Sequence, residues 1–183
     1  MSKLQNEVRG SVKKAEDDIL TEDDLIDMHY LRAVIKETLR LHPPLPLLFP
    51  KISNQDVKIN GYNIKANTQV IVNAWQVARD PKSYVYKPEE FEPERFLNAN
   101  SGLSYKGNDF ELIPFGAGRR LCPGVHFGTS VNEIALANLV HEFDWTLPGG
   151  VTSEDLDMSE AASGTVIHKE DPLKAVAIPY SSA

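Results

Sequence analysis

Phe115-Gly116-Ala117-Gly118-Arg119-Arg120-Leu121-Cys122-Pro123-Gly124 is the stretch around which this 183-residue chain is organised, and it contains the single cysteine. Its glycines lack a Cβ, so the backbone can closely approach a flat ligand or the sulfur. Pro123 suits the first position of a helix. We therefore predict Cys122 at the helix cap, near free amide donors and the positive end of the helix dipole. This setting favours the thiolate, the form of cysteine that binds metals or attacks electrophiles.

The cysteine has two other interpretations. A lone cysteine often packs as a small buried hydrophobe, but the surrounding glycines and arginines argue against that here. His126 follows Cys122 by four positions, which is compatible with a Cys–His metal pair or a nucleophile with its base. No further ligands are suitably spaced nearby, and the other four histidines are isolated in the sequence: His29, His42, His141 and His168.

The stretch resembles a family signature. Its residues match, position by position, the F-x-x-G-x-R-x-C-x-G pattern of the cytochrome P450 haem-thiolate family, closest to its plant-type microsomal members; they are Phe115, Gly118, Arg120, Cys122 and Gly124. The resemblance implies that these residues bind haem b and that Cys122 is the axial ligand of the iron. It also implies that Arg120 pairs with a haem propionate and that Phe115 shields the sulfur.

A charged pair precedes this stretch in the chain. Taken alone, Glu37 and Arg40 would be a surface ion pair on a helix, worth about 0.2–0.5 kcal/mol. Yet Glu37-Thr38-Leu39-Arg40 resembles the E-x-x-R motif of the same family, and Pro93-Glu94-Arg95-Phe96 resembles its P-E-R-F segment. The resemblance implies a buried network of Glu37, Arg40 and Arg95 that supports the cysteine loop without taking part in catalysis.

Candidate substrate contacts fall in two segments. The apolar, proline-spaced segment 45–50 resembles the family segment that lines the substrate pocket, and it contributes Leu45, Leu47 and Leu48; packing in the core is the alternative role. Near the C-terminus, the family's terminal hairpin reaches into the pocket, which makes Thr165 and Val166 further candidates. If Lys51 meets a propionate, it offers a point charge where many relatives have arginine.

The hydrophobic pattern predicts a mainly α chain with small antiparallel sheets, the α+β class. The resemblance covers residues 1–183 as the C-terminal portion of a cytochrome P450 haem domain, without the N-terminal anchor and the distal-face helices. The apolar residues of 125–143 surround much of that helix, which predicts burial on most sides and further chain to cover it. The predicted helices are 2–14, a short helix opened by a capping box of Thr21 and Asp24, 28–41, 73–80 and 125–143. The predicted strands are a hairpin of 57–59 with 62–64, a more buried strand 69–73, and a terminal hairpin of 163–167 with 175–178.

Composition limits the function classes. The chain carries 19 basic and 26 acidic residues, a net charge of −7, which argues against nucleic acid and anionic membrane surfaces as partners. No acid lies between Leu112 and Asn132, so the arginines of the cysteine loop form a local positive spot. A single cysteine excludes an intrachain disulfide and fits a reducing compartment. No apolar run is long enough to span a membrane.

The resemblance implies a monooxygenase that inserts one oxygen atom from O2 into an apolar small molecule. Its expected electron donor is a flavin-containing NADPH reductase, and its family location is the cytosolic face of the endoplasmic reticulum membrane. Two alternatives stay open. One is a truncated, non-catalytic fragment without a complete haem pocket. The other is a haem-thiolate isomerase or dehydratase, although such enzymes often depart from the cysteine signature and this chain does not.

Overall fold

The computed structural model describes residues 1–11, 19–98, 100 and 102–181. Its α-helices are α1 (Ser2–Ser11), α2 (His29–Leu41), α3 (Ala74–Val77) and α4 (Val125–Glu142). Short 3-10 helices are η1 (Glu22–Leu25), η2 (Pro93–Phe96), η3 (Gly118–Arg120) and η4 (Pro148–Gly150). The strands are β1 (Lys51–Ile52), β2 (Val57–Ile59), β3 (Tyr62–Ile64), β4 (Gln69–Val70), β5 (Phe143–Thr146), β6 (Glu160–Ser163), β7 (Val166–Lys169) and β8 (Val176–Pro179). The α+β class is confirmed, and residues 12–14 of the first predicted helix lie outside the described residues.

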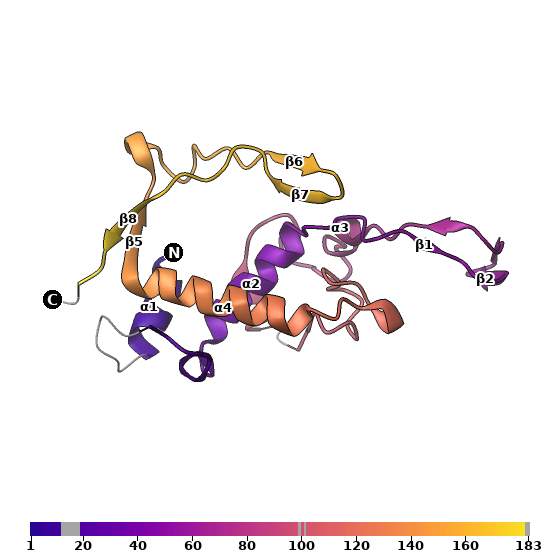
Figure 1. Ribbon diagram of the computed structural model, residues 1–183, viewed down its shortest axis with the longest axis horizontal. Helices are drawn as coiled ribbons and strands as arrows, with labels where there is room; N and C mark the ends of the chain where they lie inside the picture. Colours follow the sequence, from indigo (N-terminus) through magenta and orange to yellow (C-terminus); the bar gives the residue numbers. More distant parts are fainter. Residues whose placement is uncertain (12–18, 99, 101, 182–183) are drawn as a thin grey trace.

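Helix α2 is the central element of the fold (Figure 1). Leu31 and Ile35, one turn apart, are buried on its apolar face. The helix ends at Leu41, where the His42 amide donates to the Thr38 carbonyl at 2.8 Å, just before two prolines that cannot continue the helix. Its first amides would lack partners in an isolated helix. The carboxylate of Glu7 on α1 accepts hydrogen bonds from the Tyr30 and Leu31 amides at 2.7 and 2.8 Å and so caps α2.

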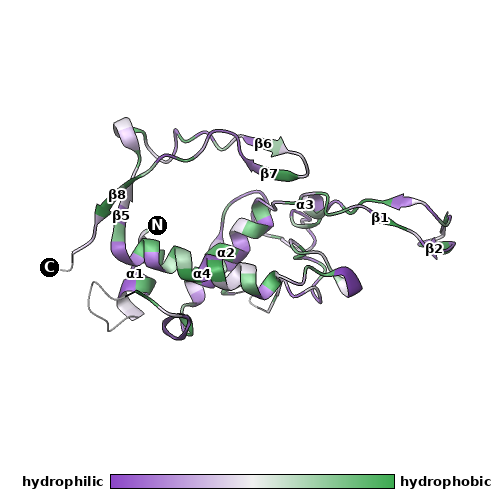
Figure 2. Ribbon diagram, in the orientation of Figure 1, coloured by the Kyte–Doolittle hydropathy of each residue, from purple (hydrophilic) through white to green (hydrophobic). Residues whose placement is uncertain are grey.

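The main core lies where α1, η1, α2 and α4 meet. Apolar residues recur along α1, α2 and α4 (Figure 2), and some from each helix are buried at this junction. Burial of such side chains is the main favourable term in folding, at about 1.5–3 kcal/mol for each large one. The buried members of the core are Leu4, Val8, Leu20, Leu25, Met28, Leu31, Ile35, Ala137 and Val140.

Helix α4 is buried on one side only in the described chain, and burial of its other sides by further chain stays a prediction. Phe127, Val131, Ala135 and Leu139, spaced four residues apart, form an exposed apolar stripe. The exposed fraction of Phe127 reaches 78%. The reason is geometric, because the described elements that pack most closely on α4 are α1, α2 and η1, and they cover its buried side.

Four antiparallel strand pairs extend from this helical centre: β1–β4, β2–β3, β5–β8 and β6–β7. The β2–β3 hairpin is confirmed, and its turn residues Asn60 and Gly61 both have positive φ (47° and 88°), as a tight hairpin turn requires. The predicted buried strand 69–73 is wrong in length and burial. Strand β4 contains only Gln69–Val70, and Val70, Ile71 and Val72 are exposed because β1–β4 is a two-stranded sheet with an open face.

The predicted terminal hairpin is also wrong in its pairing. Strand β7 pairs with β6 through a turn at Gly164, whereas β8 crosses the molecule to pair with β5, a strand that the sequence pattern missed. Arg9 on α1 holds this second pair in place. Its guanidinium stacks on the Tyr180 ring at 3.6 Å and bonds to the Phe143 carbonyl and the Asp144 carboxylate, both at 3.0 Å. The alternating pattern of short strands does not specify which strands pair. The long-range contacts of Arg9 favour the pairing of β5 with β8.

Candidate functional site

The cysteine loop is closed by backbone hydrogen bonds. The Cys122 amide donates to the Phe115 carbonyl at 3.0 Å, and the Leu121 amide donates to the Gly118 carbonyl at 3.1 Å. Gly116 and Gly118 have φ of 78° and 67°, the left-handed region that other residues rarely adopt. The two glycines therefore allow the chain to fold back, so that Cys122 returns to the start of the loop.

Cys122 is not at the helix cap, so that prediction is wrong by two residues. The N-cap residue of α4 is Gly124, and Pro123 lies before the helix because the Pro-Gly pair forms a turn. An ideal Cβ placed on Gly124 would lie 3.8 Å from Cys122 Sγ, an ordinary contact distance. The close approach of Gly124 to the sulfur therefore does not by itself require glycine. Cys122 is a free, exposed cysteine.

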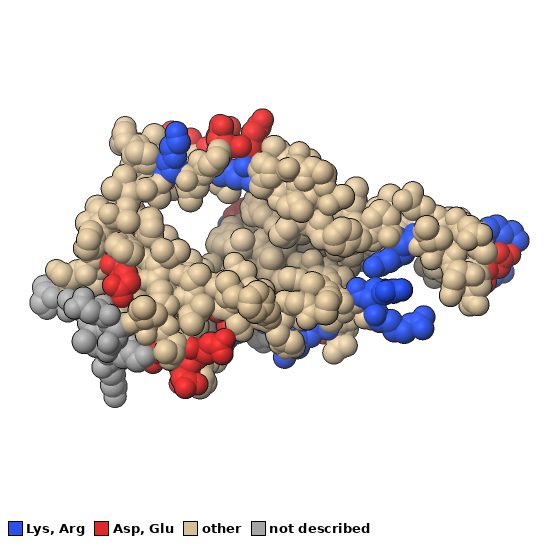
Figure 3. All heavy atoms as spheres, viewed as in Figure 1, with Lys and Arg blue, Asp and Glu red and all other residues tan. Residues whose placement is uncertain are grey.

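A cavity of about 560 Å³ lies against the cysteine loop. This volume is within the range of small-molecule and cofactor pockets. Apolar side chains form most of its wall, with Cys122 and the cationic Arg120 and Lys51 on the same wall. Lysine and arginine side chains gather without acidic neighbours at the end of the molecule where α4 begins and the β1–β4 arm leaves (Figure 3). The cavity is lined by Leu45, Leu48, Phe49, Lys51, Val72, Phe110, Ile113, Pro114, Phe115, Gly116, Ala117, Arg120, Leu121, Cys122 and Pro123.

The structure brings some of the predicted site residues together and leaves others apart. Phe115, Arg120 and Cys122 share the cavity wall with Leu45 and Leu48. Gly118 and Gly124 shape the loop but are outside the lining. Three substrate candidates also lie outside it: Leu47 is half-exposed, and Thr165 and Val166 are at the turn of the β6–β7 hairpin. For these three residues, a role in substrate contact stays a prediction.

Glu37, Arg40 and Arg95 meet in the interior. Arg40 donates from Nε and Nη2 to the two Glu37 carboxylate oxygens at 2.8 and 2.9 Å, and Arg95 Nε donates to Glu37 Oε1 at 3.1 Å. The side chains of Glu37 and Arg40 are fully buried. The interpretation of Glu37 and Arg40 as a surface pair is therefore wrong.

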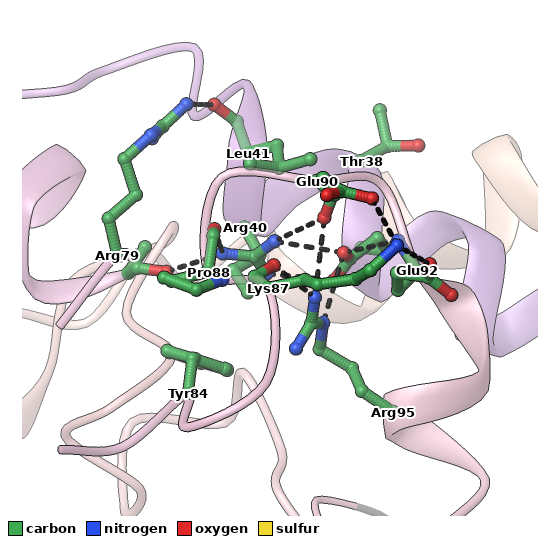
Figure 4. A network of polar contacts seen from close by, with 12 residues as sticks. Thr38, Arg40, Leu41, Arg79, Tyr84, Lys87, Pro88, Glu90, Glu92 and Arg95 are labelled. Carbon is green, nitrogen blue, oxygen red and sulfur yellow. Dashed lines mark hydrogen bonds and ion pairs between the residues drawn. The ribbon is translucent and has the colours of Figure 1, made fainter. Parts of the chain in front are cut away.

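Backbone carbonyls complete this network (Figure 4). Arg40 also donates to the carbonyls of Ala78, Pro88 and Glu90, and Arg95 donates to those of Tyr86, Lys87 and Glu90. No buried side-chain polar atom among the described residues lacks a partner. Full pairing matters, because an uncompensated buried charge is strongly destabilising. The network thus ties α2 to the irregular segment 78–95.

Sequence reasoning missed two buried members of this region. Tyr84 packs beneath Arg40, whose guanidinium carbon is 4.9 Å from the ring centroid, and its hydroxyl donates to the Glu111 carbonyl. Burial raises the pKa of Tyr84 well above its usual value. Arg79 stacks on Trp75 at 4.1 Å and donates to the Leu41 carbonyl at the end of α2. The available signal was weak, because an isolated Tyr or Arg in an irregular segment does not reveal its burial.

The structure bears on the proposed Cys122–His126 pair and on the histidines that are isolated in the sequence. His126 is exposed, and the described residues contain no cluster of three or more His, Cys, Asp or Glu side chains arranged for a metal ion. His42, which is isolated in the sequence, is not isolated in the fold, because its Nδ1 lies 2.6 Å from Glu160 Oε1. None of the helices in the described part of the chain combines the length and apolarity that a membrane crossing needs.

The chain thus combines an exposed cysteine loop, an apolar cavity with cationic groups and a buried Glu–Arg–Arg network, the features that the resemblance to the haem-thiolate class predicts. The comparisons with known proteins agree. The cytochrome P450 family matches residues 1–174, and the chain belongs to that family. It is 67% identical over 98% of its length to cytochrome P450 736A117 of Prunus mume and 56% identical over 97% to cytochrome P450 71A1 of Persea americana.

The chain spans about a third of the length of these curated relatives, 34% in both cases. Psoralen synthase of Ammi majus is a further plant relative, 53% identical over 98% of this chain. Among solved structures, a zebrafish cytochrome P450 crystallised with abiraterone superposes with a TM-score of 0.82 at 26% identity. That match covers 99% of this chain and 39% of the zebrafish chain.

Proposed function

We propose that this chain is the thiolate-bearing, C-terminal part of a haem-dependent monooxygenase, with Cys122 as the ligand of the haem iron. The observation that carries the proposal is the lining of one cavity, which contains Cys122, Arg120, Lys51 and mainly apolar side chains. Haem is a flat apolar ring with an iron at its centre and two carboxylates on its edge. A thiol, two cations and apolar side chains are the groups that such a molecule needs, so the residues present fit it.

Each residue has a separate role in this proposal. The Cys122 thiolate holds the cofactor, and the cations of Arg120 and Lys51 attract its carboxylates. Phe115 is at the loop end that bonds to the Cys122 amide, and its ring would shield the sulfur from water once haem is bound. Leu45 and Leu48 present an apolar surface to a small-molecule substrate. When bound, haem with a thiolate ligand supplies the chemistry of O2 activation, because thiolate ligation favours O–O cleavage.

The proposed partners follow from family membership. Electrons would come from a flavin-containing NADPH reductase, and the second substrate would be O2. The exposed Arg119, in a loop without acids, supports docking of an acidic electron donor at this end of the molecule. Nucleic acid is not a proposed partner of a chain with net charge −7. The proposed location of the complete protein is the cytosolic face of the endoplasmic reticulum membrane.

A second candidate is a non-catalytic fragment that lacks a complete haem pocket. The exposed stripe of α4 favours it, because Phe127, Val131 and Leu139 have no covering element among the described residues. It is also compatible with a chain that spans a third of the length of its relatives. Under this candidate the loop and network fold as described, but haem is held weakly or not at all.

The test is a spectrum of the 183-residue chain after addition of haem, reduction and exposure to carbon monoxide. Thiolate ligation should give a strongly red-shifted Soret band, and Cys122→Ser should abolish that band. His126→Gln is the matched control, because His126 is the nearest alternative ligand in the sequence, and it should leave the band unchanged. Absence of haem uptake, or a band typical of neutral ligands, would reject the first candidate for this chain and support the second.

A further inference from the structure

The β6–β7 hairpin is joined to the rest of the molecule by very few polar contacts. Its two strands pair only with each other. Among the described residues, two hydrogen-bonded contacts connect 160–169 to the body of the molecule, residues 1–142. One joins His42 Nδ1 to Glu160 Oε1 at 2.6 Å, and the other runs from the Ile167 amide to the Pro44 carbonyl at 2.8 Å. The position of the hairpin therefore depends on these two contacts.

Both contacts reach the same short segment of the body. His42 is the C-cap residue that directly follows α2, and Pro44 comes immediately before Leu45, the first residue of that segment on the cavity wall. The hairpin lies over this end of α2, close to α3 (Figure 1). A hairpin docked at 42–44 thus lies next to the wall that Leu45 and Leu48 form.

The body side of the docking point is rigid. Arg40, two residues before His42, is fully buried in the Glu37 network, and Leu41 is 4% exposed. The His42 amide is bonded to Thr38, and the Leu41 carbonyl accepts a hydrogen bond from Arg79. The backbone that carries the His42 imidazole is therefore held in place. The contact between His42 and the Glu160 carboxylate then fixes the position of the hairpin relative to it.

Two further charged side chains lie near the backbones of the pair. Lys169 is opposite Glu160 in the β6–β7 register, and its Nζ donates to the Asp171 carbonyl. Arg79, two residues after the end of α3, donates to the carbonyl of Leu41, the residue before His42. Glu160 thus has His42 of the body and Lys169 of its own hairpin as neighbours. The His42 contact is the one of these that crosses from hairpin to body.

We propose that His42 and Glu160 are positioning residues that set where the β6–β7 hairpin docks beside the Leu45–Leu48 wall of the cavity. Thr165 and Val166 are at the turn of this hairpin, so the docked position fixes their distance from that wall. The consequence for the substrate rests on the proposed function. The contact and its effect on the hairpin do not, because they need neither haem nor turnover.

The test is amide hydrogen exchange of the 183-residue chain without cofactor, read at the Ile167 amide and along α2. His42→Ala and Glu160→Gln should each raise exchange at Ile167 by roughly two- to fivefold, the range expected for a partly exposed ionic contact. Their combination should add nothing further, and exchange in α2 should not change. His42→Gln keeps a side-chain N–H donor and should restore most of the protection.

His168→Ala is the matched control, because the His168 ring bonds only to the neighbouring Lys169 carbonyl of its own strand. It should leave exchange at Ile167 as in the unsubstituted chain. Unchanged exchange in Glu160→Gln, or an equal rise in His168→Ala, would overturn the proposal. If His42→Ala loosens α2 as well, Glu160→Gln decides, since that exposed side chain is remote from the helix core. Failure of the carbon monoxide spectrum would reject the proposed function and leave this result unaffected.

Discussion

Replacing Arg40 by lysine should destabilise the fold strongly, although the charge is kept. Arg40 donates five hydrogen bonds, two to the Glu37 carboxylate and three to backbone carbonyls. A lysine ammonium has three donors, so at least two of these five hydrogen bonds are lost. Each such loss costs about 1–3 kcal/mol. Allowing for partial relaxation, we expect the free energy of unfolding to fall by about 2–5 kcal/mol.

Urea denaturation followed by far-ultraviolet circular dichroism measures this change. With a denaturant slope of about 2 kcal/mol per M, the midpoint should fall by about 1–2.5 M. Arg95→Lys should have a smaller effect, because Arg95 donates four hydrogen bonds and only one must be lost. The exposed Arg119→Lys is the control and should change stability by less than about 0.5 kcal/mol. The reasoning would be refuted if Arg40→Lys and Arg119→Lys had the same urea midpoint.

Three further substitutions test other parts of the fold. Glu7→Gln should cost about 0.5–2 kcal/mol in urea denaturation, because it weakens the cap on the Tyr30 and Leu31 amides, whereas the exposed Glu154→Gln should be neutral. Burial raises the pKa of Tyr84, so the contribution of its neutral phenol to stability is complete below pH about 10 and is lost as the pH rises above that value. Tyr84→Phe should therefore reduce the difference between the urea midpoints at pH 8 and pH 11. The exposed Tyr62→Phe should leave that difference unchanged. Gly116→Ala should lower the free energy of unfolding by about 1–2 kcal/mol, because φ there is 78°, whereas Gly128→Ala in α4 has free space for its methyl group and should raise it by about 0.4–1 kcal/mol. Thermal unfolding distinguishes the opposite signs of the two glycine substitutions.

The helices were predictable from the sequence because their signals are local. The apolar spacing of α2, the prolines that follow it and the Asn-Gly turn of β2–β3 each act within a few residues, and the structure confirms all three. The strand partners near the C-terminus were not predictable in this way. The pairing of β5 with β8 depends on Arg9, more than 130 residues away from the groups that it contacts. No local pattern reports such a contact.

The site shows the same division. Local motifs located Cys122, Arg120 and the Glu37 network, since their spacing within each motif is fixed by the loop and helix that carry them. They did not locate Phe49, Val72 or Phe110, which reach the cavity from three separate segments. Nor did they locate Tyr84, whose burial depends on the packing of Ala33, Phe96 and Leu112 around it. Such side chains have no sequence signal apart from their apolar character.

The position of the Glu37 network explains how it can matter to a site that it does not touch. Leu45 follows Arg40 by five residues, so fixing the end of α2 fixes the start of one cavity wall. The same face of α2 carries Ala33, seven residues before Arg40, and Ala33 packs in a cluster with Leu112, three residues before Phe115. One helix therefore supports both the Leu45–Leu48 wall and the cysteine loop. Loosening the network should let the two walls move relative to each other, which would alter the cavity before it removed any residue that lines it.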